Sequence, residues 1–253
     1  MTAPNNITNR DIVLEIKNLH KSFGDNHVLN GFNMQLFQGE NLVIMGKSGS
    51  GKSVMIKCLV GLMEADSGTI SVMYNDITKL NQEALDILRA DIGFLFQGSA
   101  LYDSMTVREN LEFPLRRHTK KFGEHIDTET MVIEALESVG LANSIDLMPS
   151  ELSGGMKRRV ALARTLILQP KIILYDEPTS GLDPITAKEI IILMQDIQKK
   201  YGTSSLIITH DVDCARVISD RMILLIDGID YAVGTYAELS ASTDPKIKAF
   251  FKH

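Results

Sequence analysis

Residues 46–53, with the sequence GKSGSGKS, constrain the fold more than any other part of the chain. The apolar residues 42–45 precede this segment, and the nearly all-apolar run 53–63 follows it. A glycine-rich loop between a strand and a helix lets backbone amides point at phosphate oxygens, and the helix N-terminus adds a field that favours anions. The context therefore predicts an α/β fold with a phosphate-binding loop, rather than a plain glycine-rich turn.

Two side chains of this phosphate loop predict contacts with a nucleoside triphosphate and its metal ion. We expect Lys52 to bridge the β- and γ-phosphates of ATP and the hydroxyl group of Ser53 to bind Mg²⁺. The backbone can wrap closely around phosphates because glycines recur in the loop. The residues expected to bind the nucleotide here are Gly46, Lys47, Ser48, Gly49, Ser50, Gly51, Lys52 and Ser53.

Two adjacent carboxylates follow a second apolar run at residues 172–175. Asp176 suits a hold on Mg²⁺, and Glu177 suits the polarisation of an attacking water molecule. Adjacent residues of an extended chain point to opposite sides, so the two carboxylates can do different work. Taken alone, the pair could also be a solvated strand end.

A second possible anion site begins at residues 152–156, with the sequence LSGGM, called the signature segment below. Ser153 would cap a helix, and Gly154 and Gly155 would leave its first amides bare. A chain that already has one phosphate loop can use this helix start only if another nucleotide is presented to it. The alternative is a capped helix start without such a role.

Short apolar runs elsewhere predict the strands of an α/β fold, and a further strand is expected after Gly24. Helical patterns interleave with the later runs; one begins at Asp183–Pro184 and ends near Gly202. Strands that alternate with helices favour a mostly parallel sheet covered on both faces. The predicted strands are residues 13–16, 42–45, 69–73, 92–96, 172–175, 206–209, 222–226 and 231–233.

The middle of the chain has a different pattern. Thr106 and Glu109 match a capping box, and residues 127–139 and 153–169 have helical patterns. No convincing strand falls between Phe96 and Ile172, which predicts a helical insertion at residues 98–168. We expect one domain over residues 11–253, with residues 1–10 as a flexible tail.

Composition narrows the possible partners and the cellular location. The net charge of −6 gives no support for a nucleic-acid partner. The N-terminus lacks the features of a signal peptide, and no window has the ~20 apolar residues that a spanning helix requires. Any membrane role must therefore come through a partner. Cys58 and Cys214 lie in apolar contexts and are expected to be buried free thiols.

Together, these motifs resemble the ABC ATPase family over nearly the whole chain. The resemblance implies a P-loop nucleoside triphosphatase with a mostly parallel core, an N-terminal antiparallel β portion and an inserted helical subdomain. It implies that Phe23 stacks on adenine, and that Gln97 joins the nucleotide and its metal to a partner subunit. Taken alone, Phe23 would be an ordinary core aromatic.

The same resemblance implies a dimer in which two copies pack head to tail. Ser153, Gly154 and Gly155 would close on the γ-phosphate bound to the opposite copy, and residues 180–183 would cross the interface. His210, after an apolar strand, would sense the γ-phosphate, although a lone histidine at a strand end is more often structural. The implied catalytic residues are Glu177, His210 and Lys52.

A closer resemblance is to the ATPase of lipid-asymmetry (Mla-type) phospholipid transporters, carried by residues 95–115, Met156 with residues 157–159, and residues 183–186. It implies a peripheral protein at the cytoplasmic face of the inner membrane, with a multispanning permease and further lipid-transfer subunits as partners. A transporter of another substrate, or a non-transport switch of the cell-division type, remain alternatives. On composition alone, residues 157–159 favour a solvated helix face.

The segment after Gln97 is apolar but interrupted by Gly98, Ser99 and Asp103. We expect its apolar side chains to line a groove for a cytoplasmic helix of the membrane subunit, because a buried core helix would have a steadier 3.6-residue pattern. The alternative is that they pack the helical insertion onto the core. The side chains concerned are Leu101, Tyr102 and Met105.

Overall fold

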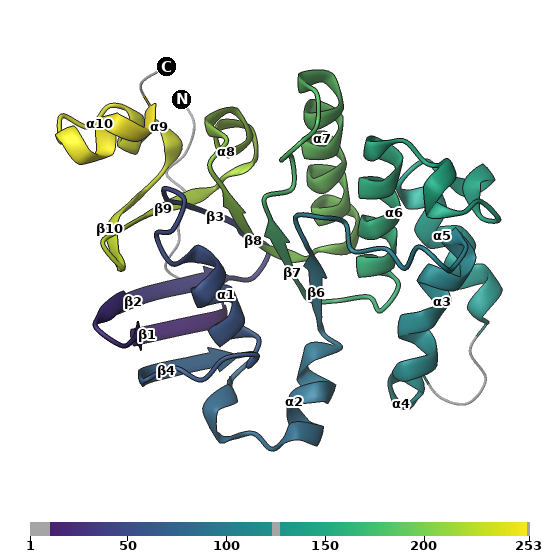
Figure 1. The fold of residues 1–253 in the computed structure, drawn as a ribbon, viewed down its shortest axis with the longest axis horizontal. Coiled ribbons are helices and arrows are strands. Elements are labelled where there is room, and N and C mark those ends of the chain that lie inside the picture. The colour runs from purple at the N-terminus through teal and green to yellow at the C-terminus, as the bar shows by residue number, and fades with distance from the viewer. Residues whose placement is uncertain (1–10, 123–126, 252–253) are drawn as a thin grey trace.

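The computed structural model describes residues 11–122 and 127–251, so the tail expected at residues 1–10 lies outside the described residues. It contains two sheets (Figure 1). An antiparallel sheet has the order β2-β1-β4-β5 and consists of β1 (Ile12–Phe23), β2 (Asn26–Phe37), β4 (Ser67–Val72) and β5 (Asn75–Asp76). The expected N-terminal antiparallel portion is confirmed.

The second sheet has six strands in the order β10-β9-β3-β8-β7-β6. Its strands are β3 (Asn41–Met45), β6 (Ile92–Leu95), β7 (Ile172–Asp176), β8 (Ser204–Thr209), β9 (Arg221–Ile226) and β10 (Ile229–Gly234). Neighbouring strands are parallel except β10, which runs antiparallel to β9. The prediction of a mostly parallel sheet is confirmed.

The six-stranded sheet separates two hydrophobic cores, because alternate residues of each strand face opposite sides. On β7, Ile173 and Tyr175 join the core beneath the helices, whereas Ile172 and Leu174 join the other core. The helices of the first core include α6 (Gly154–Leu166), α7 (Pro184–Tyr201) and α8 (Val212–Ile218). The second core is closed by α1 (Lys52–Leu59) together with the antiparallel sheet.

The segment between β6 and β7 is helical, and its described residues contain no strand. Its helices before α6 are α3 (Val107–Arg117), α4 (Thr119–Phe122) and α5 (Thr128–Ser138), with short 3-10 helices at Ala142–Ser144 and Pro149–Glu151. Thr106 and Glu109 form the predicted capping box at the start of α3. The boundary of the helical insertion at residues 98–168 remains a prediction.

The remaining helices lie at the edges of the fold. They are α2 (Gln82–Arg89), α9 (Tyr236–Ser240), α10 (Pro245–Phe251) and a 3-10 helix at Ile77–Lys79. One expected helix is shorter than predicted: the run 53–63 forms a helix only as far as Leu59, and Gly61 has a φ of +67° that a continuing helix cannot adopt. Asp183 caps α7 and Gly202 ends it, as predicted.

Candidate functional site

The phosphate loop joins β3, which is buried along its whole length, to the start of α1. Gly49 and Gly51 have φ values of +79° and +101°, the left-handed region that favours glycine. A Cβ atom on Gly51 would also lie 3.0 Å from the carbonyl oxygen of Val28, so this position has no room for a side chain. Residues 47–49 and Ser53 are exposed, as a loop that receives a ligand requires.

Lys52 is the buried cation of the loop, with 9% of its surface exposed. Its Nζ donates hydrogen bonds to the carbonyl oxygens of Gly46 at 2.6 Å and Lys47 at 3.0 Å. Burial lowers the pKa of Lys52, and the nearby carboxylates of Glu177 and Asp176 raise that pKa in opposition. The two hydrogen bonds therefore hold the ammonium group in place, and the two carboxylates offset part of its charge.

Asp176 and Glu177 lie at the same edge of the sheet as Lys52. Strands β3 and β7 both pair with β8 in parallel, so their carboxyl ends meet there. The pKa of Asp176 is raised by burial first and by the charge of Glu177 second, while Lys52 lowers it. The predicted cation and both predicted carboxylates thus form one electrostatic cluster.

The backbone at Glu177 differs from the sequence expectation. Its φ is +49°, so Glu177 has left the extended strand, and the alternation of side chains along a strand does not set its direction. Its amide instead donates to the carbonyl oxygen of Ile208 at 2.8 Å. The two carboxylates are separated by this turn of the backbone and not by strand geometry.

His210 follows β8 and contacts Glu177 directly. The Nδ1 atom of His210 lies 2.8 Å from Oε2 of Glu177, and the backbone amide of His210 donates to the same oxygen at 3.3 Å. The imidazole ring is largely exposed, whereas the Glu177 side chain is nearly covered. The geometry therefore orients the Glu177 carboxylate and leaves the histidine ring free to meet a ligand.

Gln97 is linked to this cluster through the loop that follows Glu177. The Nε2 atom of Gln97 donates to Oγ of Ser180 at 3.2 Å, and the amide of Ser180 donates to the carbonyl oxygen of Glu177 at 3.1 Å. Asp183, at the end of this loop, accepts hydrogen bonds from the amides of Ile185 and Thr186 as the N-cap of α7.

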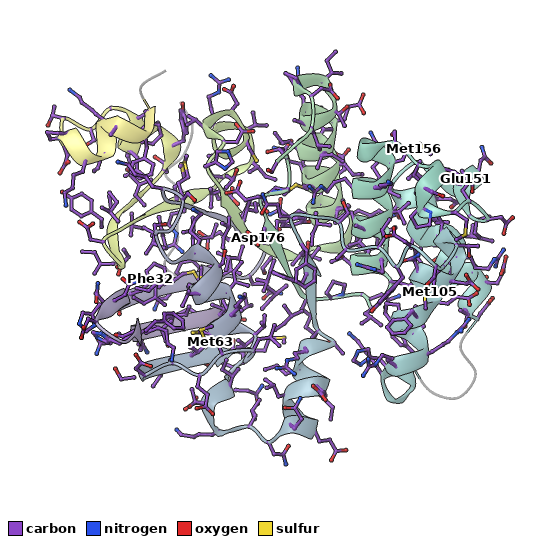
Figure 2. The ribbon with its side chains drawn as sticks, viewed as in Figure 1. Phe32, Met63, Met105, Glu151, Met156 and Asp176 are labelled. Carbon is purple, nitrogen blue, oxygen red and sulfur yellow. The ribbon has the colours of Figure 1, made fainter. Side chains whose placement is uncertain are left out.

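The signature segment begins α6, and Ser153 caps this helix by accepting a hydrogen bond from the amide of Met156 at 3.2 Å. Gly154 is exposed with open space beside its Cα, whereas a Cβ on Gly155 would lie 2.7 Å from Thr186. Asp176 lies near the middle of the molecule, and Met156 lies at the end formed by α5 and α6 (Figure 2). Within one chain, the signature segment therefore stays apart from the cluster around Lys52.

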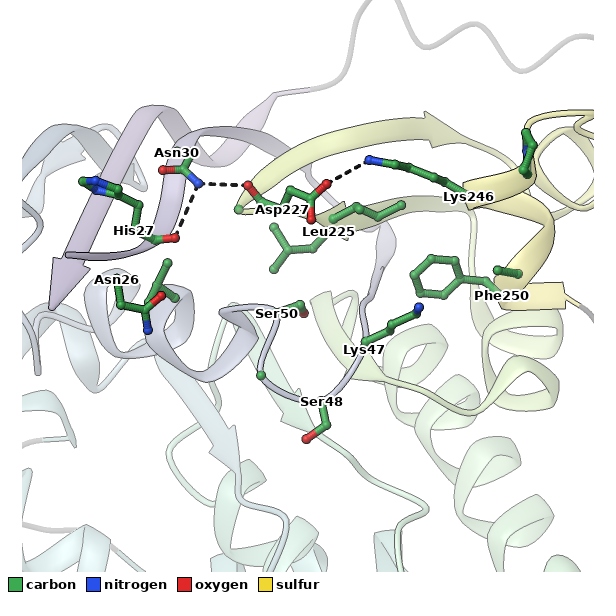
Figure 3. A pocket seen from close by; sticks show the side chains of 16 residues that line it. Asn26, His27, Asn30, Lys47, Ser48, Ser50, Leu225, Asp227, Lys246 and Phe250 are labelled. Atoms are coloured by element: carbon green, nitrogen blue, oxygen red, sulfur yellow. Dashed lines mark hydrogen bonds and ion pairs between the residues drawn. The ribbon is translucent and has the colours of Figure 1, made fainter.

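A pocket of about 750 Å³ borders the phosphate loop at residues 47–50 (Figure 3). Its other walls come from β2, from the turn between β9 and β10, and from α10, which contributes Lys246 and Phe250. The Nζ atom of Lys246 pairs with Asp227 at 2.9 Å. Sequence reasoning missed these α10 residues, because only the tertiary fold brings them to the loop.

Phe23 lies at the end of β1 and is 49% exposed, so it is not an ordinary core aromatic. The Nζ atom of Lys21 lies 5.6 Å from the centre of its ring. Phe23 is not among the residues that line the pocket beside the phosphate loop. Its exposed face leaves it free to stack on a base, and its predicted role in binding adenine remains a prediction.

A groove of about 1300 Å³ runs between α2, α3 and the segment after β6. Of the three residues predicted to line it, only Tyr102 does so; it is 43% exposed, and its ring centre lies 4.9 Å from that of Phe113. Leu101 packs against the helical core instead. Met105 is half-buried and is not among the residues that line this groove, so its predicted role remains a prediction.

The expectation of a solvated helix face at residues 157–159 is wrong for Arg158, which is 4% exposed. Both cysteines are buried and unpaired, as predicted. No helix in the described parts of the chain combines the length and the apolar character needed to cross a membrane.

The sequence is similar to those of known ATP-binding proteins of transporters. Residues 29–180 match the model of the ABC transporter family. The chain is 38% identical, over 94% of its length, to the "probable ribonucleotide transport ATP-binding protein mkl" of Mycobacterium leprae, and 40% identical, over 86% of its length, to the methionine import ATP-binding protein MetN of Brucella abortus. It spans 68% and 58% of the lengths of these two relatives.

Solved structures give the same assignment. The fold superposes on cbiO1 of Clostridium perfringens, part of the ABC transporter complex cbiONQ, with a TM-score of 0.82, 29% identity and 96% coverage of each chain. It also superposes on a dimeric ATP-binding cassette bound to ADP and Pi, with a TM-score of 0.79, 32% identity and coverage of 88% of this chain and 98% of that one. The chain belongs to the ABC transporter family and is an ATP-hydrolysing cassette of that family.

Proposed function

We propose that two copies of the chain bind ATP head to tail and that hydrolysis drives a membrane transporter. One observation carries this proposal: Lys52, Glu177 and His210 meet at one edge of the sheet, whereas the anion-ready helix start at Ser153 lies apart from them. A second copy, turned around, can present its signature segment to the nucleotide of the first. The similar cassette bound to ADP and Pi is dimeric, which supports this arrangement.

In this mechanism Glu177 orients and polarises the attacking water, and His210 holds the Glu177 carboxylate while its exposed ring senses the γ-phosphate. Lys52 offsets charge on the phosphates. The hydroxyl of Ser53 and the carboxylate of Asp176 are oxygen donors, which fit Mg²⁺. When bound, the ion neutralises phosphate charge. Gln97 would connect this site to movements elsewhere, because it shares a hydrogen bond with Ser180.

The groove beside Tyr102 is the proposed dock for a cytoplasmic helix of a multispanning permease. It exposes apolar side chains, including Ile87, Phe96 and Tyr102, at 62%, 43% and 43% of their surfaces. Apolar patches of this kind commonly mark contact sites. The chain would then lie at the cytoplasmic face of the inner membrane as a peripheral subunit.

For the cargo we propose phospholipid, moved between the inner and outer membranes with the help of further lipid-transfer subunits. Support comes from residues 95–115 and from Met156 with the basic residues 157–159 that follow it, which resemble the ATPase of lipid-asymmetry transporters. A second candidate is another cargo, since the similar proteins mkl and MetN are named for ribonucleotide and methionine transport.

The test is purification of the tagged chain from membranes of the cell that makes it, followed by identification of the copurifying proteins and lipids. We expect a multispanning permease, an anchored lipid-binding subunit and bound phospholipid. The purified complex should hydrolyse ATP faster in phospholipid vesicles than in detergent. Stimulation of the ATPase activity of the purified complex by methionine or nucleotides would indicate another cargo. Recovery of division proteins without a permease would contradict a transport role.

A further inference from the structure

The guanidinium group of Arg158, on α6, is buried without a carboxylate partner. Only 4% of the residue is exposed, and none of the described acidic side chains forms an ion pair with it. Its Nη1 donates to the carbonyl oxygen of Phe96 at 2.7 Å, its Nη2 to that of Ser180 at 3.4 Å, and its Nε atom has no hydrogen-bond partner. All of its hydrogen bonds therefore go to the backbone of two loops.

Burial of this charge is costly, which argues against a role in packing alone. Loss of solvent lowers the pKa of the Arg158 guanidinium, although an arginine remains protonated in proteins. An apolar side chain of similar length would fill the same space without this desolvation cost and without an unpaired Nε. Stability of the fold alone therefore does not explain a guanidinium group at this position.

The two loops that Arg158 joins are the loops of the nucleotide site. Phe96 directly precedes Gln97, and Gln97 itself donates to the hydroxyl of Ser180. Ser180 is in turn bonded through its amide to the carbonyl oxygen of Glu177. Arg158 thus lies at the point where the segment of Gln97 and the loop after Glu177 meet α6.

The start of the segment after Gln97 has an unusual backbone conformation. Ser99 and Ala100 have φ values of +61° and +49°, which non-glycine residues rarely adopt. Arg164, six residues further along α6, also holds this stretch by donating to the carbonyl oxygen of Ser99 at 3.3 Å. Arginines of the helix that starts at Ser153 therefore hold the start of the segment at Phe96 and Ser99, and Asn110 of α3 holds its later part at Tyr102.

We propose that Arg158 is a positioning residue that holds Gln97 and the Ser180 loop to the start of α6. The signature segment and Arg158 lie on the same helix. When the signature segment of one copy meets the nucleotide of the other, Arg158 therefore positions Gln97 and Glu177 of its own copy at the same time. The inference rests on the proposed roles of Gln97 and Glu177 in hydrolysis.

The test compares Arg158→Met and Arg158→Lys with the unchanged full-length chain, measuring the affinity for MgATP and kcat. Arg158 does not contact the phosphate loop, so we expect ATP affinity to change by less than about twofold, while Arg158→Met lowers kcat by about tenfold or more because Gln97 and Glu177 are misplaced. Arg158→Lys keeps the charge but not the fork and should fall between the two.

A matched control is Arg159→Met on the same helix. Arg159 donates to the carbonyl oxygen of Val139 and pairs with Glu189, both away from the Gln97 segment. We expect the kcat of this variant to stay within about twofold of the unchanged chain. The control shows how much the loss of any neighbouring arginine on α6 changes kcat through helix stability alone. An equal loss of kcat in both arginine variants would show a general effect of α6 and would overturn the proposal.

A double-mutant cycle separates positioning from stability. If Arg158 acts through Gln97, then in a Gln97→Ala background Arg158→Met should lower kcat by less than about threefold further. The proposal is overturned if Arg158→Met keeps normal kcat, if the two losses multiply fully, or if both Arg158 variants fail to fold. Normal turnover of Gln97→Ala or Glu177→Gln would instead count against the proposed function, so the two failures can be told apart.

Discussion

At the residue scale, the site depends on how Lys52 is held. Its ammonium group is buried, donates to two carbonyl oxygens of its own loop and feels the charges of Asp176 and Glu177. A cation fixed in this way needs no rearrangement of its own backbone to meet an anionic phosphate. We therefore expect Lys52 to contribute to binding and to hydrolysis alike.

Replacement of this cation tests that reading. Lys52→Ala should weaken ATP binding and lower turnover together, the latter by about 10²-fold or more, because the phosphates lose their buried cation. Lys57→Ala is a matched control, since Lys57 is exposed on the same helix. Binding by calorimetry and phosphate release measure the two effects. Affinity and rate that both stay within a few-fold would remove Lys52 from the site.

Tyr175 offers a residue-scale test of stability. It is 1% exposed, its hydroxyl group has no hydrogen-bond partner, and burial raises its pKa so that the group stays neutral. Tyr175→Phe removes the unsatisfied hydroxyl and should raise the free energy of unfolding by about 1 kcal/mol, as seen in urea titrations. A loss of stability of similar size would mean that the hydroxyl has an unseen partner, such as a buried water molecule.

At the element scale, the groove between α2 and α3 is the place where we propose that a partner acts on the site. Tyr102 lines it, its ring packs near Phe113, and the guanidinium of Arg164 lies 5.7 Å from the ring centre. Arg164 also holds the segment after Gln97. A helix that presses into this groove would therefore act on the same elements that carry Gln97.

A charge placed in the groove tests this connection. Tyr102→Asp should weaken copurification with the permease and uncouple transport, because docking of an apolar helix would bury the new carboxylate away from water. Thermal stability and ATP binding of the isolated chain should stay near normal, since the side chain is partly exposed. Tyr102→Phe keeps the ring and serves as the control. Unfolding of Tyr102→Asp, or unchanged assembly and transport, would contradict docking at this position.

Local sequence patterns predicted the parts of the fold that neighbouring residues determine. The phosphate loop and the caps at Thr106, Ser153 and Asp183 are all present, because a cap bonds to amides two or three residues away. The bounds of β2 were not predictable in the same way. Gly31, at a φ of +91°, interrupts the alternation of buried and exposed side chains along β2. The buried residues Leu29 and Phe32 are therefore three positions apart instead of two.

Contacts between distant segments were beyond sequence reasoning. The basic residues 157–159 look like a solvated face, yet Arg158 is buried because loops from two other parts of the chain fold over it. The wall that α10 adds to the pocket beside the phosphate loop is another example. No periodicity in a single sequence reports which loop carbonyl a side chain will meet.

At the scale of the whole molecule, the two anion-binding elements lie in different parts of the chain. Lys52 lies at the start of α1, and Glu177 and His210 directly follow the parallel strands β7 and β8. Asp176, which precedes Glu177, lies near the middle of the molecule, whereas Met156 of the signature segment lies at the end formed by α5 and α6 (Figure 2). One copy cannot bring them together without rearranging its core. In the proposed mechanism, a second copy therefore completes each nucleotide site.

A substitution at the signature segment should block the dimer without harming the fold. Gly154 is exposed, with no atom within 4 Å of an added Cβ, so Gly154→Asp fits the single chain. Its carboxylate would repel a γ-phosphate brought to the same place by a second copy. We expect normal ATP binding and normal thermal stability but no dimer in the presence of ATP. Dimerisation of this variant would place the interface elsewhere.

The most direct measurement is the oligomeric state of Glu177→Gln in ATP, by size exclusion with light scattering. The amide keeps the shape of the side chain but cannot polarise water as a carboxylate does, so hydrolysis should fall by about 10²-fold or more and leave ATP in place. We expect a stable dimer with two bound ATP molecules, and a monomer once Gly154→Asp is added. A variant that binds ATP and remains a monomer, or that hydrolyses ATP at the normal rate, would contradict the proposed mechanism.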